Sequence, residues 1–176
     1  SGKVVLLDAG VVLGFAAASA VTNDYLLYQD EKTDGTAGNA YTAGAWRTGI
    51  LNTEAVDTGA IGSIASNQIT LPAGSYEFHG FINIGFATAT ADTIGRARLQ
   101  NVTDTTTVAQ GVQQRLDTTV NSPGLVLTVH GQFTISGSKV YELQVYPKTN
   151  NTTAAIAHTT GNSEIYASIF FRRYLT

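Results

Sequence analysis

The sequence has 176 residues, of which only 13% are charged, and its formal net charge is −3 at pH 7. Because no block of Lys or Arg is present, the chain lacks the electrostatic signature of a nucleic-acid-binding protein. Because it has no cysteine, it excludes disulfides, thiol catalysis and cysteine-based zinc sites.

The first predicted unit is an apolar N-terminal arm, residues 1–23, with a strand expected near 4–7. Ala18-Ser19-Ala20 is similar to the cleavage site of a secretory signal, but Asp8 interrupts the apolar run. The uninterrupted part, 9–22, is shorter than the roughly 20 residues that cross a bilayer, so we expect no membrane insertion. Two interpretations stay open: the arm packs on its own domain, or it anchors the protein to a partner. The candidate anchor residues are Val4, Val5, Leu6, Leu7, Val11, Val12, Leu13 and Phe15.

Residues 24–176 form the predicted β-domain, in which apolar and polar residues repeatedly alternate. Turn residues separate the alternating runs at Pro72-Ala73-Gly74, at a predicted hairpin over 101–104 and at Ser136-Gly137-Ser138, and the polar segment 149–162 is expected to be a surface loop. Many short strands at this spacing predict an all-β fold, an antiparallel β-sandwich of the jelly-roll type. The expected strands are 24–30, 47–53, 67–71, 75–87, 94–101, 106–112, 124–136, 139–147 and 164–175.

Two of these strands place aromatic residues on both faces. In 75–87, Phe81 has the same parity as Glu77 and His79, and in 164–175 three aromatic residues lie opposite the apolar face. A single sandwich has one interior, so the second layer must come from another copy of the chain, the arm or a ligand. Burying each aromatic residue is worth roughly 1.5–3 kcal/mol, which favours oligomerisation. The candidate interface residues are Phe81, Tyr166, Phe170 and Tyr174.

Several segments resemble a domain of tailed-bacteriophage structural proteins, found around tail fibres and other virion-surface components. They are AGAWRTGILNTEAVDTGAIGSIASNQITLPAGSYEF, RARLQNVTDTTT, GQFTISGSKVYELQVY and EIYASIFF. The order of elements also resembles the C1q and tumour-necrosis-factor (TNF) jelly roll, in which three subunits pack their inner sheets about a threefold axis. The resemblance covers about residues 24–176 and implies a homotrimer on the surface of a phage particle.

Motifs of catalysis and metal binding are weak in this sequence. Ser136-Gly137-Ser138-Lys139 matches the S-x-x-K pattern of serine acylases, but it joins two strands where Gly and Ser are ordinary turn residues. His79 and His130 lie on polar strand faces, where they could approach across a sheet or an axis, and His158 is remote in sequence. Glu54, Asp57, Glu77 and Glu142 show no spacing typical of a glycosidase pair. We therefore expect no cofactor, no metal and no enzymatic activity.

Three functions follow from these expectations. The first is a capsid-decoration or head-fibre protein, because only about 20 residues precede the domain and so short an arm cannot form a fibre shaft. The second is the receptor-binding tip of a tail fibre or tailspike, with loops such as 31–44, 102–106 and 149–162 contacting a host surface glycan. The third, an enzyme acting on host polysaccharide, requires carboxylates or histidines gathered in one cleft. The expected partners are other copies of the chain, other virion proteins and, for the tip, the glycan.

Overall fold

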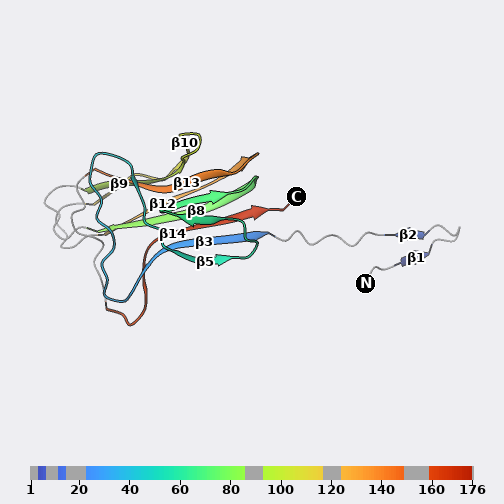
Figure 1. Ribbon diagram of the computed structural model, residues 1–176, viewed down its shortest axis with the longest axis horizontal. Coiled ribbons are helices and arrows are strands. Elements are labelled where there is room, and N and C mark those ends of the chain that lie inside the picture. The colour runs from blue at the N-terminus through green and yellow to red at the C-terminus, as the bar shows by residue number, and fades with distance from the viewer. Residues whose placement is uncertain are drawn as a thin grey trace.

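The computed structural model describes residues 4–6, 12–14, 23–85, 93–116, 124–148 and 159–175. Every regular element in these ranges is a β-strand, and the strands of the domain form two packed antiparallel sheets (Figure 1). No helix in the described ranges is long and apolar enough to span a membrane. The prediction of an all-β antiparallel sandwich is therefore confirmed.

The first layer is a five-stranded sheet in the order β12-β8-β14-β3-β5. The two longest strands, β8 and β12, pair along their whole length from Gly74↔Ile135 to Gly85↔Gly124. In β8, tyrosine, phenylalanine and isoleucine alternate with polar residues, and the apolar set faces the second layer. The bounds are β3 Asp24–Lys32, β5 Thr53–Asp57, β8 Gly74–Gly85, β12 Gly124–Ile135 and β14 Glu164–Tyr174.

The second layer is a seven-stranded sheet whose main path is β10-β9-β13-β7-β6. Two short strands extend it, because β11 pairs with β9 and β4 pairs with β13. The hairpin between β6 and β7 turns at Ser66 and Asn67, which both adopt positive φ, as a two-residue type I′ turn requires. The bounds are β4 Arg47–Thr48, β6 Ser63–Ala65, β7 Gln68–Leu71, β9 Thr93–Asn101, β10 Thr106–Gln110, β11 Gln114–Leu116 and β13 Lys139–Pro147.

The core lies between the layers and is centred on an aromatic cluster. Phe133 on β12 contacts Tyr141 on β13 across the two sheets, with ring centroids 5.1 Å apart. Phe171 on β14 lies beside Phe78 on β8, at 6.1 Å. Apart from Phe133, these rings are fully buried, so the predicted inward parities of 75–87, 124–136 and 139–147 are confirmed.

Three parts of the predicted strand map are corrected. The single strand predicted at 47–53 is wrong beyond Thr48: Arg47–Thr48 joins β13, residues 49–52 are not in a strand, and β5, which joins β3 in the other sheet, overlaps the predicted range only at Thr53. The turn at 136–138 connects the two layers and does not close a hairpin, because β12 and β13 belong to different sheets. The alternation rule missed β2, β6 and β11, since three residues are too few to display a period. The predicted hairpin over 101–104 is confirmed.

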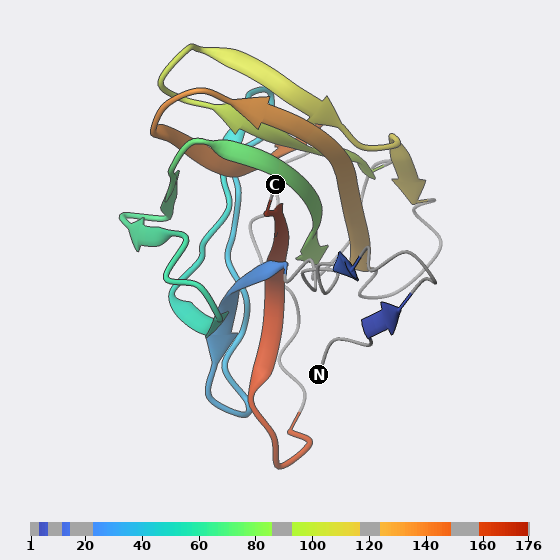
Figure 2. The same cartoon turned by 90° about the vertical axis from the view of Figure 1, so that its right-hand side faces the viewer.

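In the arm, β1 (Val4–Leu6) and β2 (Val12–Gly14) form a separate two-stranded antiparallel sheet. The strand predicted near residue 4 is thus confirmed over three residues, and β2 is its partner. Figure 2 looks along the long axis of the molecule, with β1 and β2 on the side nearest the viewer. Among the described strands, neither β1 nor β2 pairs with a strand of the sandwich.

One glycine lies where the backbones of the two layers approach closely. Gly111, just after β10, donates its N–H to the Ala97 carbonyl at 2.9 Å, and a Cβ at this position would lie 1.7 Å from the Thr128 carbonyl oxygen of β12. We therefore expect Gly111→Ala to lower the free energy of unfolding by about 3 kcal/mol, since backbone must move to admit the methyl group. Urea unfolding would measure this. Gly137→Ala is the matched control, because its Cβ would meet no atom within 4 Å; an equal loss in both variants would contradict the expectation.

Glu142 on β13 joins three strands of the second layer. Its carboxylate accepts hydrogen bonds from Gln68 of β7 at 2.8 Å and Thr48 of β4 at 2.8 Å, and also from Gln144. Burial opposes the charge, but these hydrogen bonds and the nearby Arg98 guanidinium hold the pKa of Glu142 below its usual range.

Because that pKa is lowered on folding, the ionised carboxylate stabilises the protein at neutral pH, and the contribution is lost as the pH falls through the lowered pKa. We expect Glu142→Gln to be less stable than the wild type by about 1–3 kcal/mol at pH 7, as a neutral amide cannot accept all three bonds. The difference should shrink below about pH 4.5, the usual glutamate pKa. Urea unfolding of both proteins from pH 7 to pH 3 checks this, and a constant difference would contradict it.

Candidate subunit interface

The outward face of the five-stranded sheet carries the residues that the sequence singled out. Successive side chains of a strand point to opposite faces, and in β8 the buried residues are Tyr76, Phe78, Ile82 and Ile84. Glu77, His79 and Phe81 therefore face away from the core. In β14, Phe171 faces inward and Phe170 outward in the same way.

Apolar side chains from five neighbouring strands form one patch on this face. Phe81 lies between Thr128 of β12 and Ser168 of β14, and Phe170 lies between His79 and Leu27. Both phenylalanines are only half-buried. Phe170 also stacks on Tyr25, with ring centroids 5.7 Å apart. We call this surface the outward patch; it consists of Tyr25, Leu27, Val56, Phe81, Val126 and Phe170.

Within one chain the outward patch is incompletely covered. Tyr25 on β3 and Val56 on the adjacent β5 are 37% and 41% exposed, and Val126 on β12, at the opposite edge of the sheet, is 50% exposed. Exposed apolar side chains gathered on one face are typical of interaction sites in soluble proteins. The subunit interface on this face stays a prediction.

A polar network borders the patch at one end. Arg172 of β14 forms a salt bridge with Glu77 of β8, and the Tyr174 hydroxyl donates to the same carboxylate at 3.1 Å. Partial burial opposes ionisation of Glu77, but the hydrogen bonds from Tyr174 and His79 and the charge of Arg172 hold its pKa below the usual range. Tyr174 is thus a half-buried outward-facing residue, engaged in this network.

Tyr166 differs from the other three candidate interface residues. It is only 5% exposed, and its hydroxyl donates to the Thr36 carbonyl at 2.9 Å and to the Glu164 carboxylate. A register shift between Ile165 and Ala167 lies at this point of β14. The loop after β3 therefore supplies the second layer over Tyr166, and a partner subunit would contact Phe81, Phe170 and Tyr174.

The candidate anchor residues are located only in part. Val4, Val5 and Leu6 lie in β1, and Val12 and Leu13 lie in β2. Leu7, Val11 and Phe15 lie outside the described residues. The anchor role of the arm therefore stays a prediction.

Of the other candidate groups, Glu77, His79 and His130 lie together on the outward face of the five-stranded sheet, and the remaining carboxylates lie elsewhere. His79 and His130 are directly paired across β8 and β12, with ring centroids 6.0 Å apart, so they do approach across a sheet; His158 lies outside the described residues. No group of three or more metal-binding side chains occurs in the described ranges. Three of the carboxylates have separate partners: Glu54 accepts from Tyr28, Asp57 accepts from the Ile61 N–H, and Glu142 joins strands of the second layer.

No protein-family model matches the chain, and no curated protein matches its sequence. Solved structures match its fold. A crystal structure of murine APRIL at pH 5.0 superposes with a TM-score of 0.54 at 8% identity, covering 86% of this chain and 99% of that chain. Another, at pH 8.5, gives a TM-score of 0.50 at 7% identity with the same coverage. At such low identity the likeness establishes the fold alone, a C1q/TNF-like jelly roll.

Proposed function

We propose that this chain is a non-enzymatic structural protein that assembles as a homotrimer and is displayed on the surface of a tailed-phage particle. The observation that carries the proposal is the outward patch. Five adjacent strands expose apolar side chains on one sheet face, and Phe81 and Phe170 lie near its centre. A second and third copy of the same surface would remove these side chains from water.

A threefold arrangement is proposed from the fold. The patch lies on the outward face of one sheet of a C1q/TNF-like jelly roll, which supports the trimer. The residue pattern of the domain resembles phage virion-surface domains, which supports the location on a phage particle. Within that assembly the arm would anchor the trimer to another virion protein. The proposed role is capsid decoration or a head fibre, with the receptor-binding tip of a tail fibre or tailspike as the alternative.

Two measurements test the proposal. Mass determination in solution should give three times the 18.5 kDa of one chain, and a stable monomer at micromolar concentration would overturn the assembly. Gold-labelled antibodies against the domain should then decorate particles of the phage whose genome encodes the chain. Label on the head supports decoration, label on the tail supports the tip, and unlabelled particles would overturn the virion role.

A further inference from the structure

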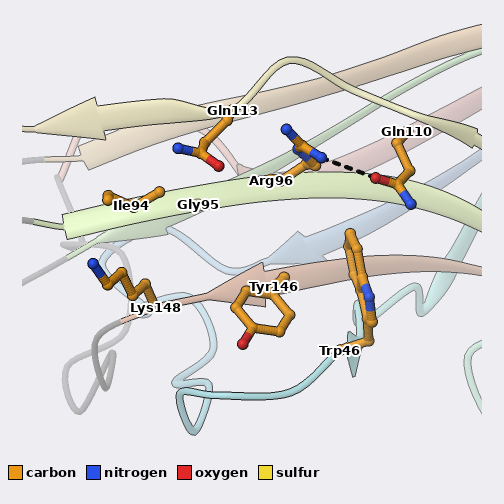
Figure 3. A pocket seen from close by; sticks show the side chains of 8 residues that line it. All are labelled: Trp46, Ile94, Gly95, Arg96, Gln110, Gln113, Tyr146 and Lys148. Atoms are coloured by element: carbon orange, nitrogen blue, oxygen red, sulfur yellow. Dashed lines mark hydrogen bonds between the residues drawn. The ribbon is translucent and has the colours of Figure 1, made fainter.

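A groove of about 520 Å³ lies on the outward face of the seven-stranded sheet. It is lined by Trp46, Ile94, Gly95, Arg96, Gln110, Gln113, Tyr146 and Lys148 (Figure 3). Its volume falls in the range of roughly 300–1,000 Å³ that is usual for small-ligand sites. Because the groove and the outward patch belong to different sheets, association through the patch would leave the groove open.

The register of three strands assembles the groove. Arg96 of β9 is directly opposite Tyr146 of β13, and both point outward because their neighbours Ala97 and Val145 are buried. Gln110 of β10 accepts a hydrogen bond from Arg96 Nη1 at 3.0 Å. Tyr146, Arg96 and Gln110 thus come from three adjacent strands, Gln110 lying diagonally from Arg96 because its own register partner is Arg98, and Trp46 lies beside Tyr146 (Figure 3).

The loop before β4 fixes Trp46. Gly44, at φ 81°, donates its N–H to the Pro147 carbonyl at 3.0 Å, and this positive φ favours glycine. Trp46 packs edge-on against Tyr146 at 5.5 Å, and the Arg98 guanidinium lies 4.2 Å from its ring centroid. Arg98 contacts the Trp46 ring but does not line the groove. The part of the indole that Arg98 does not cover is the part that faces the groove.

The lining has positive charge and no carboxylate. Arg96 and Lys148 line the groove, and neither forms a salt bridge with a described residue. The Arg96 Nε atom is buried and lacks a hydrogen-bond partner among the described residues. Because that nitrogen is not accessible, an anion in the groove would be bound by the terminal nitrogens of the guanidinium, of which Nη1 also donates to Gln110.

From these features we infer that the groove binds an acidic saccharide, a sugar unit bearing a carboxylate. The planar guanidinium of Arg96 suits a carboxylate, with Lys148 adding a second positive charge. The rings of Trp46 and Tyr146 suit the apolar C–H face of a sugar. The amides of Gln110 and Gln113 can both donate to and accept from hydroxyl groups. The proposed ligand, an acidic saccharide, would bind in this groove whether the protein lies on the head or on the tail of the particle.

The chemistry of the groove favours a saccharide over nucleic acid. The net charge of −3 disfavours any long polyanion, so the choice between acidic ligands depends on the groove itself. The positive charge of the groove is local and is combined with aromatic and amide groups. A ligand with one carboxylate per sugar unit matches that combination better than a phosphate backbone does.

Calorimetric titration of the whole protein with three acidic probes tests the inference: oligogalacturonate, an oligomer of α2,8-linked sialic acid and an alginate oligomer. At least one should bind with a dissociation constant of about 1 mM or tighter. The same oligomer with its carboxyl groups reduced to alcohols should bind at least about tenfold more weakly, because the charge-assisted hydrogen bonds are lost. No binding by any probe, or equal binding of the reduced form, overturns the inference.

Variants assign the binding to the groove. Arg96→Gln should weaken it about tenfold or more, and Lys148→Gln, at an exposed position, should weaken it severalfold. Lys139→Gln is the matched control, since it removes the same charge from β13 outside the groove and should change affinity less than twofold. Unchanged binding in both groove variants overturns the inference, as does equally tight binding of inorganic phosphate or oligothymidylate. A monomeric Phe81→Glu protein should retain binding. That outcome would show that the groove binds the saccharide whether or not the chain forms a trimer.

Discussion

Replacing Phe81 with glutamate is expected to convert the proposed trimer into monomers without unfolding the domain. Phe81 lies in the outward patch, flanked by Thr128 and Ser168, and it contributes no atom to the buried core cluster. Burying its ring between subunits is worth roughly 1.5–3 kcal/mol, and this occurs in every copy. The glutamate variant would lack this favourable free energy of burial. It would also place an unpaired charge at the interface, where the charge would have to leave water.

Light scattering coupled to size-exclusion chromatography measures the change. The variant should elute at 18.5 kDa at concentrations where the wild type is trimeric, with a cooperative unfolding transition retained. Val112→Glu is the control, because Val112 is 74% exposed and lies beyond the patch, so this variant should stay trimeric. A trimeric Phe81→Glu protein would place the subunit contact on another surface.

Adjacent phenylalanines of β14 should respond very differently to truncation. Phe171 is fully buried and lies against Tyr76, Phe78 and Phe133, so Phe171→Ala should cost about 3–5 kcal/mol of unfolding free energy. At this chain length that corresponds to a melting temperature lower by about 10 °C. Phe170 faces outward and stacks on Tyr25, so Phe170→Ala should cost about 1 kcal/mol within one chain.

The comparison is best made in the monomeric Phe81→Glu background, where association does not add to stability. Urea unfolding of the two alanine variants then isolates the contribution of each face of β14. Similar losses in the two variants would mean that the outward face is covered by the same chain, and would remove the main support for a subunit interface.

Much of the sandwich was predictable because its strands are long and one-sided. β8 and β12 each extend over twelve residues, so alternation fixes both their type and their inward faces. The division of strands between sheets was not predictable, because Arg47 and Thr53 are six positions apart and yet join different layers. That choice depends on which edge is free in three dimensions, and local periodicity carries no such information.

The two surfaces differ in how far sequence reveals them. Parity was enough to place Phe81 and Phe170 outward, but it could not show that the loop carrying Thr36 covers Tyr166. The sequence did not predict the groove, because Trp46, Arg96 and Tyr146 come from three separate segments. Only the pairing of the strands brings these segments together. A usable signal existed in β9, where Arg96 and Arg98 alternate with the small or apolar residues Gly95, Ala97 and Leu99.

The pairing of the outer strands decides where foreign sequence can be grafted onto this domain. Asp24 at the start of β3 is paired with Arg173 near the end of β14, so a payload fused after β14 would emerge at the end of the sandwich where β3 begins (Figure 1). The turn at Asp34 and Gly35 lies at the far end of the same strand pair, next to Glu164. An epitope inserted there would lie at the opposite end of the sandwich, so the two positions could display separate sequences without interfering with each other.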